Sequence, residues 1–185
     1  DLRALARRSQ EIYPYLCKEL SLSTGISPQF FKSGMLITGL NRNEKQVALD
    51  EPGTVVVEPD DLAALEPGLT GNTGGIYSSE IANVRNPALV KALVSDCLRL
   101  GVEIHSNAKA TRTLKLANHY HVILEDGRKF ESEYVLISAG AWSSSLLKQF
   151  DSAEQVVPVK GQIIAIKAKP GVVRRTILHK GRYLI

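Results

Sequence analysis

The feature that most constrains the fold is an apolar run, Tyr134–Ile137, followed at once by the small residues 138–141. Consecutive apolar residues of this kind indicate a strand buried on both faces, as in a parallel sheet. Small residues at the carboxyl end of such a strand let a ligand approach the backbone. The helix expected over 142–150 would then offer free amides to a phosphate. A tight strand–helix joint that needs Gly140 explains the pattern equally well.

The rest of the chain mixes helix–strand units with antiparallel hairpins. Helices are expected over 1–24, 62–65 and 86–100, and strands over 30–40, 54–57, 74–78, 102–105, 109–116, 120–124, 129–137, 156–168 and 174–185. Pro14 predicts a kink or a break in the first helix. Asn41–Lys45 is polar and is expected to be a turn, and Asp126-Gly127 is typical of a hairpin turn. Asn86-Pro87 is typical of a helix start, with Asn as the cap.

Composition excludes several classes of protein. With 185 residues, 44% hydrophobic and 23% charged, the chain can bury a core and is unlike a disordered protein. No apolar stretch approaches the roughly 20 residues that span a bilayer. The net charge of +4 is spread over short basic clusters, which favours a solvated surface over nucleic-acid binding. Cys17 and Cys97 lack a Cys or His partner at metal-binding spacing and are expected to be free thiols.

The spacing of polar residues predicts no catalytic side chain. The chain contains no Gly-x-Ser-x-Gly elbow, no Walker loop and no Gly-x-Gly-x-x-Gly fingerprint. His119 and His121 would lie on one face of a strand, where they could bind a metal. Because no third ligand is near them in sequence, the favoured interpretation is two polar strand residues, and we predict no metal site.

Five motifs resemble, in the same order, those of the FAD-dependent D-amino-acid oxidase superfamily. They are Ser33–Leu36, Val84–Leu93, Ser138–Ser143, Pro158–Gln162 and His179–Ile185. Each motif is only moderately specific, whereas the ordered set spans nearly the whole chain and is much more so. Among members of the superfamily, the set most resembles the glycine oxidases of thiamine biosynthesis.

The resemblance implies an α/β (mixed α+β) fold, with a partial FAD-binding, Rossmann-like domain interwoven with an antiparallel-sheet substrate domain. Residues 1–85 would be mainly substrate-domain elements with an N-terminal helix, 86–150 an FAD-domain section and 151–185 substrate-domain strands. In the family the first strand carries the dinucleotide fingerprint, and a closing segment supplies an arginine for the substrate carboxylate. We therefore expect the chain to be an internal section of a longer enzyme and inactive by itself.

The resemblance also implies a reaction and its residues. An FAD enzyme would oxidise glycine or a similar small amino acid to an imino acid by hydride transfer to the flavin N5, and molecular oxygen would become hydrogen peroxide. Ala110 would meet the adenine end of FAD, and the flavin nucleotide would be lined by Ser138, Ala139, Gly140 and Trp142. Tyr183 matches a tyrosine whose hydroxyl binds the substrate carboxylate. A packing role stays open for Trp142 and Tyr183.

Two other functions stay open. A D-amino-acid dehydrogenase or a sarcosine-oxidase-like flavoenzyme would share these motifs, because substrate choice depends on pocket residues largely outside the chain. A non-catalytic fragment or interaction module would account for the missing fingerprint. The resemblance implies a cytoplasmic protein, the scattered charge favours no nucleic-acid partner, and a homo-oligomer is compatible with the sequence.

Overall fold

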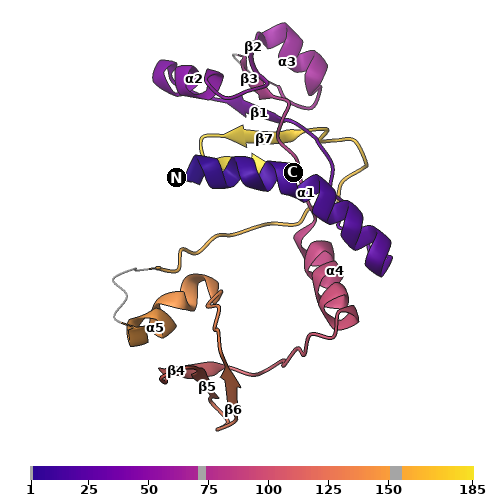
Figure 1. Ribbon diagram of the computed structural model, residues 1–185. Helices are drawn as coiled ribbons and strands as arrows, with labels where there is room; N and C mark the ends of the chain where they lie inside the picture. The colour runs from indigo at the N-terminus through magenta and orange to yellow at the C-terminus, as the bar shows by residue number, and fades with distance from the viewer. Residues whose placement is uncertain (1, 71–73, 151–155) are drawn as a thin grey trace. The chain divides into compact units, whose positions relative to one another are not determined.

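The computed structural model describes residues 2–70, 74–150 and 156–185 (Figure 1). The chain divides into two compact units, one of Asp1–Glu103 with Lys167–Ile185 and the other of Ile104–Ile166. Helices combine with one mixed and one antiparallel sheet, so the predicted mixed α/β fold class is confirmed. The assignment of 1–85, 86–150 and 151–185 to substrate and cofactor domains stays a prediction.

The first unit is built on a five-stranded sheet with the order β2-β3-β1-β7-β8. The strands are β1 (Met35–Thr38), β2 (Thr54–Val57), β3 (Gly75–Ser78), β7 (Thr176–His179) and β8 (Arg182–Leu184). Only the pairing of β1 with β7 is parallel, and the other three are antiparallel. Leu36 on β1 and Ile76 on β3 are fully buried, and each of these two strands has a partner along both edges.

The segment 174–185 is a hairpin, so the prediction of one long strand there is wrong. β7 and β8 pair antiparallel, with His179 opposite Arg182. The two residues between them, Lys180 and Gly181, both have positive φ, at 46° and 76°. A type I′ turn requires positive φ at both central residues, and the Lys-Gly dipeptide supplies it at one position without steric cost.

Two helices of the first unit pack against each other. They are α1 (Leu2–Thr24) and α4 (Asn86–Arg99), and their shared core contains Cys17, Leu20, Leu89 and Ala92. The helix α1 continues through Pro14 without a break, although its axis changes direction near the middle in Figure 1. Among the described residues, neither this helix nor any other is apolar enough over a sufficient length to cross a bilayer.

Two details of the helix ends correct the sequence predictions. Asn41 begins a helix, α2 (Arg42–Leu49), where a turn was expected: its side chain accepts from the amide of Glu44, whose carboxylate accepts from the amide of Asn41. This is the reciprocal capping box. Asn86 is not a cap, because the N-cap of α4 is Arg85. The short helix α3 (Pro59–Leu65) contains the predicted residues 62–65 and begins three residues earlier, at Pro59.

The second unit holds a three-stranded antiparallel sheet. Its strands are β4 (Ala110–Lys115), β5 (Tyr120–Leu124) and β6 (Lys129–Ser132), with the predicted turn at Asp126-Gly127. A helical segment follows, formed by η1 (Gly140–Trp142), α5 (Ser143–Leu147) and η2 (Lys148–Phe150). It packs on the sheet, since the amide of Thr113 donates to Gln149 and the ring of Tyr120 meets Phe150 edge-on.

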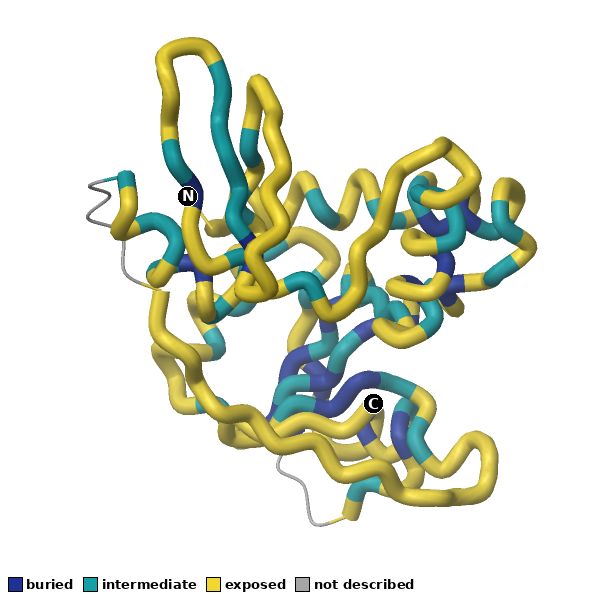
Figure 2. The backbone as a smooth tube through the Cα atoms, turned by 90° about the horizontal axis from the view of Figure 1, so that it is seen from below, coloured by how far each residue is buried: buried dark blue, intermediate teal, exposed yellow. Residues whose placement is uncertain are grey.

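Three apolar segments expected to be strands form none in the described structure. They are 102–105, the second half of 129–137, and 156–168. Tyr134 is 83% exposed and Leu136 is 90% exposed, and every residue of 102–105 and 156–168 is exposed. Figure 2 shows how much of the described backbone is exposed, in yellow. A strand buried on both faces needs neighbours along both edges, and no described segment pairs with these three.

Candidate functional site

The predicted strand–helix joint, residues 138–142, lies in the second unit, and the backbone at Gly140 has free space beside it. The amide of Trp142 donates to the carbonyl of Ala139 at 3.1 Å, which closes a turn ahead of the helical segment. Gly140 has a φ of +55°, and a Cβ added there would meet no described atom within 4 Å. The glycine therefore serves the local backbone conformation and not a close approach of another described segment, which leaves room for a ligand.

The side chains at this joint are largely exposed. Ser138 is exposed, Ala139 is half-buried, and the indole of Trp142 is 73% exposed. Such a ring in water leaves a large apolar face without a partner among the described residues. The geometry is thus compatible with the cofactor role that the resemblance implies, and packing within the described chain does not explain Trp142.

Ala110 is the first residue of β4, where it pairs with Leu124 next to a register shift. The strand β4, which begins at Ala110, contacts the helical segment formed by α5 and η2. Gln149 makes both contacts: it accepts from the amide of Thr113 at 2.8 Å and donates to the carbonyl of Thr111 at 3.3 Å. All five residues predicted to bind the cofactor therefore belong to one compact unit.

Tyr183 lies in the other unit, on the edge strand β8. Tyr183 lies opposite Leu178 on β7, and Leu178 in turn lies beside Ile37 on β1. Residues aligned in this way point to the same face of a sheet. The side chain of Tyr183 is 55% exposed in the described structure, and both its predicted substrate role and the alternative packing role stay predictions.

The face that carries Tyr183 is also hollowed. A pocket of about 390 Å³ is lined by Met35, Ile37 and Ser78 of this face, by Arg3 and Arg7 of α1, and by Glu51 in the connection between α2 and β2. Arg3 and Arg7 lie 3.9 and 3.6 Å from the carboxylate of Glu51. No pocket was predicted here from the sequence. The available signal was the spacing of the two arginines, which places them on one face of a helix.

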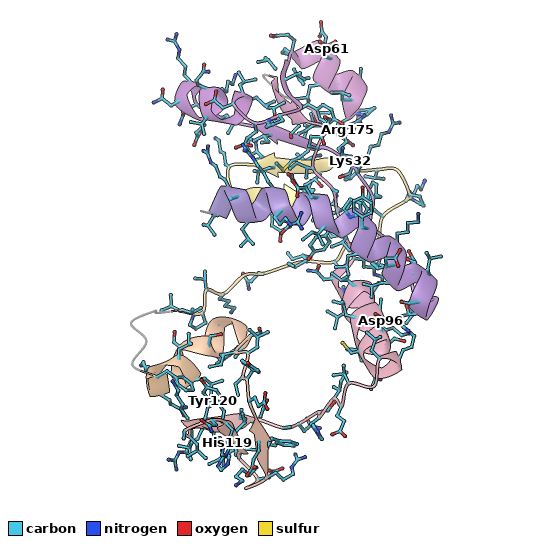
Figure 3. All side chains as sticks on the ribbon, viewed as in Figure 1. Lys32, Asp61, Asp96, His119, Tyr120 and Arg175 are labelled. Atoms are coloured by element: carbon cyan, nitrogen blue, oxygen red, sulfur yellow. The ribbon has the colours of Figure 1, made fainter. Side chains whose placement is uncertain are left out.

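A buried carboxylate holds the strands that carry Tyr183. Glu66 is 1% exposed and accepts from the backbone amides of Arg174 and Arg175 at 3.1–3.2 Å. The guanidinium of Arg175 lies 5.7 Å from the ring centroid of Tyr77 and also donates to the carbonyl of Leu65 (Figure 3). These contacts fix the start of β7, and through the hairpin they fix β8.

A cluster of polar side chains, Asn83, Ser33 and Thr176, also holds the start of β7 in place. The side-chain amide of Asn83 donates to Ser33 at 2.6 Å and to Thr176 at 2.8 Å. Ser33 and Thr176 are both buried, so each hydroxyl finds its partner inside the protein. The amide of Thr176 also donates to the carbonyl of Gly34, which ties β7 to the loop before β1.

One acidic residue at the pocket rim has a shifted pKa. Glu80 lines the pocket and accepts from the ammonium of Lys32 at 2.7 Å (Figure 3). The hydrogen bond and the charge of Lys32 lower the pKa of Glu80 below the usual range of a glutamate. The rim of the pocket therefore carries an ionised pair at neutral pH.

Known proteins resemble this chain along nearly its whole length. The family model described as FAD dependent oxidoreductase matches residues 1–185. The glycine oxidase of Pseudomonas aeruginosa is 32% identical over 187 residues, and that of Pseudomonas putida is 31% identical over 187 residues. Each alignment covers 98% of this chain and 51% of the relative, so the chain spans about half the length of these proteins.

A solved structure agrees with the sequence matches. The crystal structure of glycine oxidase from Bacillus cereus superposes with a TM-score of 0.88 at 26% identity, and covers 99% of this chain and 53% of its own. The fold described above is therefore similar to that of about half of this glycine oxidase.

Proposed function

Because the chain belongs to the FAD-dependent oxidoreductase family, we propose that the whole protein oxidises the amine of glycine or a similar small amino acid. The products are an imino acid and, after electron transfer to molecular oxygen, hydrogen peroxide. The observation that carries the proposal is the likeness to glycine oxidases, which extends over 98% of the chain. A cytoplasmic location and a role in thiamine biosynthesis belong to the same proposal; one relative, 23% identical, is a bifunctional ThiO/ThiG protein.

The residues at the joint fit the family's cofactor. Gly140 leaves its backbone open, and Trp142 offers an exposed apolar ring beside it. Ser138, Ala139, Gly140 and Trp142 would hold the flavin nucleotide, and Ala110 would meet its adenine end. When bound, FAD supplies the two-electron oxidation of the carbon–nitrogen bond.

Tyr183 has the task of orienting the substrate. Its exposed hydroxyl would donate to the amino-acid carboxylate, and the anchors at Glu66 and Thr176 would keep the hairpin in place. A hydrogen bond to a charged group contributes about 1.5–3 kcal/mol. No side-chain base is required by this proposal, because positioning of the substrate does most of what the protein contributes.

Oxygen uptake by the whole protein tests the proposal. Glycine, sarcosine and D-alanine would be compared as substrates, with peroxide measured in the same reactions. We expect oxygen consumption with glycine and an equal amount of peroxide. A preference for D-alanine without oxygen uptake would contradict the proposal.

That outcome would favour a D-amino-acid dehydrogenase. The alternative has a specific observation behind it: the D-amino acid dehydrogenase of Neisseria meningitidis is 24% identical over 173 residues. Reduction of an artificial electron acceptor, with D-alanine and without oxygen, separates the two functions.

The 185-residue chain by itself is expected to bind FAD weakly or not at all. It has no Gly-x-Gly-x-x-Gly fingerprint, which in this family holds the pyrophosphate. The flavin absorbance of the purified chain measures this directly. A stoichiometric yellow protein would overturn the expectation.

A further inference from the structure

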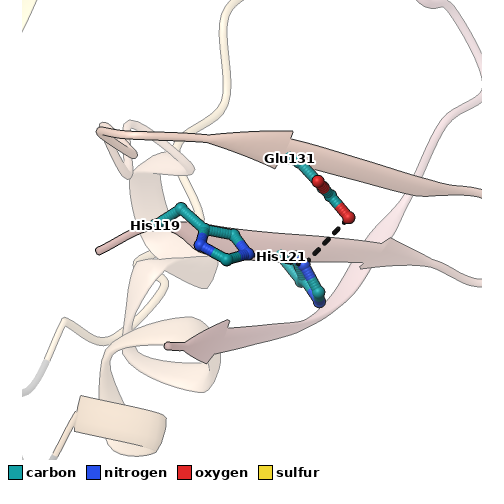
Figure 4. A group of neighbouring side chains, drawn as sticks. All are labelled: His119, His121 and Glu131. Atoms are coloured by element: carbon teal, nitrogen blue, oxygen red, sulfur yellow. Dashed lines mark hydrogen bonds and ion pairs between the residues drawn. The ribbon is translucent and has the colours of Figure 1, made fainter. Parts of the chain in front are cut away.

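Three side chains with metal-binding chemistry converge on one face of the three-stranded sheet (Figure 4). His121 lies on β5, and His119 comes immediately before this strand. Because side chains two residues apart along a strand point to the same face, the two imidazoles lie on one face of the sheet. The register places Glu131 of β6 directly opposite His121. The third ligand, which was not visible in the sequence, comes from the neighbouring strand.

The distances are those of a compact ligand set. The Nε2 atoms of His119 and His121 are 3.1 Å apart, and Nε2 of His121 is 3.0 Å from Oε1 of Glu131. In a tetrahedral zinc site with bonds of about 2.0–2.1 Å, neighbouring ligand atoms are about 3.3–3.4 Å apart. These two distances need to grow by only a few tenths of an ångström to receive an ion, and all three ligand atoms already lie within 4.8 Å of one another.

Hydrogen bonds among His119, His121 and Glu131 do not satisfy all of their polar atoms. Nε2 of His121 contacts both the other imidazole and the carboxylate. A ring nitrogen carries either one hydrogen or one lone pair, so in the neutral ring it cannot accept from His119 and donate to Glu131 together. One shared, bifurcated bond is the best outcome. A cation would instead receive a lone pair from each of the three groups.

We propose that His119, His121 and Glu131 bind a divalent transition-metal ion of the Zn²⁺ type, with the remaining position open to water. Two imidazoles and a carboxylate are a donor set that suits zinc. The ion would join β5 to β6, and β6 leads into the segment before the joint at 138–142.

Two cations share this face of the sheet. Lys129 lies 2.9 Å from Oε1 of Glu131, and Arg112 and Lys129 both align with Ile123, two residues along β5 from His121. The side chain of Lys129 is 47% exposed, so it can turn into solvent when an ion takes the carboxylate oxygen. The positive neighbours weaken the site without blocking it.

Titration of the untagged 185-residue chain with Zn²⁺, followed by calorimetry, tests the proposal. We expect one ion per chain, and visible absorption bands of tetrahedral Co²⁺ when Co²⁺ is used as the probe. His121→Gln and Glu131→Gln should each lower the affinity about tenfold or more, as losses in metal sites commonly do. Binding should also weaken at acid pH, because the ligand atoms must be deprotonated to bind the ion.

Two variants serve as matched controls. Glu125→Gln removes a carboxylate of the same unit that lies 2.6 Å from Lys109, and His179→Gln removes a histidine bonded to Thr38. Both should bind Zn²⁺ like the unchanged chain, and far-UV circular dichroism reports whether every variant is folded. Binding to folded Glu131→Gln as tight as to the unchanged chain, equal losses in the controls, or no saturable site at one equivalent would overturn the proposal.

Discussion

Two apolar segments of four residues have different fates in the two units. Met35–Thr38 becomes β1, between β3 and β7, and its Leu36 is fully buried. Tyr134–Ile137 is at least as apolar but forms no strand, and Leu136 is 90% exposed. The difference lies in the neighbours: described strands flank the first segment on both edges and flank the second on neither. Apolar composition gives the tendency to form a strand, and pairing decides whether it is buried.

Truncating one leucine in each segment tests most directly whether the two segments differ in burial. Leu36→Ala should lower the free energy of unfolding of the first unit by about 2–5 kcal/mol, because it opens a cavity in a packed core. Leu136→Ala should change the stability of the 185-residue chain by about 0.5 kcal/mol or less, as an exposed position does. Urea denaturation measures both, and similar losses for the two variants would contradict the comparison.

Removal of the buried carboxylate should have the next largest effect. Glu66→Ala leaves the amides of Arg174 and Arg175 without their acceptor, at a cost of about 1–3 kcal/mol for each buried group that stays unsatisfied. Hydrogen exchange at β7 would show faster opening. Glu125→Ala, which removes an exposed carboxylate of the second unit, is the control and should leave exchange at β7 unchanged.

Helix capping gives a smaller effect. Asn41→Ala breaks the capping box of α2 and should destabilise that helix by about 0.5–2 kcal/mol. Asn86→Ala is its matched control, because Asn86 lies inside α4 and caps nothing. Amide exchange in α2 and α4 measures the two variants, and equal effects would mean that the capping box does not stabilise α2.

The smallest expected effect is electrostatic. Hydrogen bonds and charge from Lys32 and Lys129 lower the pKa of Glu80 in the first unit and of Glu131 in the second. A lowered folded pKa contributes stability that is present above the pKa of the unfolded glutamate and is lost as the pH falls through the folded pKa. NMR titration should give both glutamates midpoints below the usual value. Lys32→Met should raise the midpoint of Glu80 and leave that of Glu131 in place.

Local signals in the sequence predicted much of the fold. The strand β2, the Asp-Gly turn between β5 and β6, and the helix α3 all appear where they were expected, α3 with three more residues at its start. The helix at Asn41 was missed although its Asn-x-x-Glu pattern was present, because the polar composition was interpreted as a turn. The hairpin at Lys180-Gly181 was missed because the whole segment 174–185 was interpreted as one strand.

Features that depend on distant residues could not be predicted. The sequence does not show which strand lies beside β5, so Glu131 was not recognised as a neighbour of His121. The pocket on the Tyr183 face requires α1 to lie over a sheet whose strands come from both ends of the chain. Burial of Tyr134–Ile137 was predicted from its composition, and composition does not supply the neighbouring strands.

The glycine kinetics of Tyr183→Phe in the whole protein test the central claim most directly. The substitution keeps the ring on β8 and removes only the hydroxyl, so the flavin spectrum should be unchanged. Loss of a hydrogen bond to a carboxylate, about 1.5–3 kcal/mol, predicts a fall in kcat/KM for glycine of about 10- to 100-fold, mostly through KM. A kcat/KM equal to that of the unchanged enzyme would contradict the assignment of Tyr183 to the substrate.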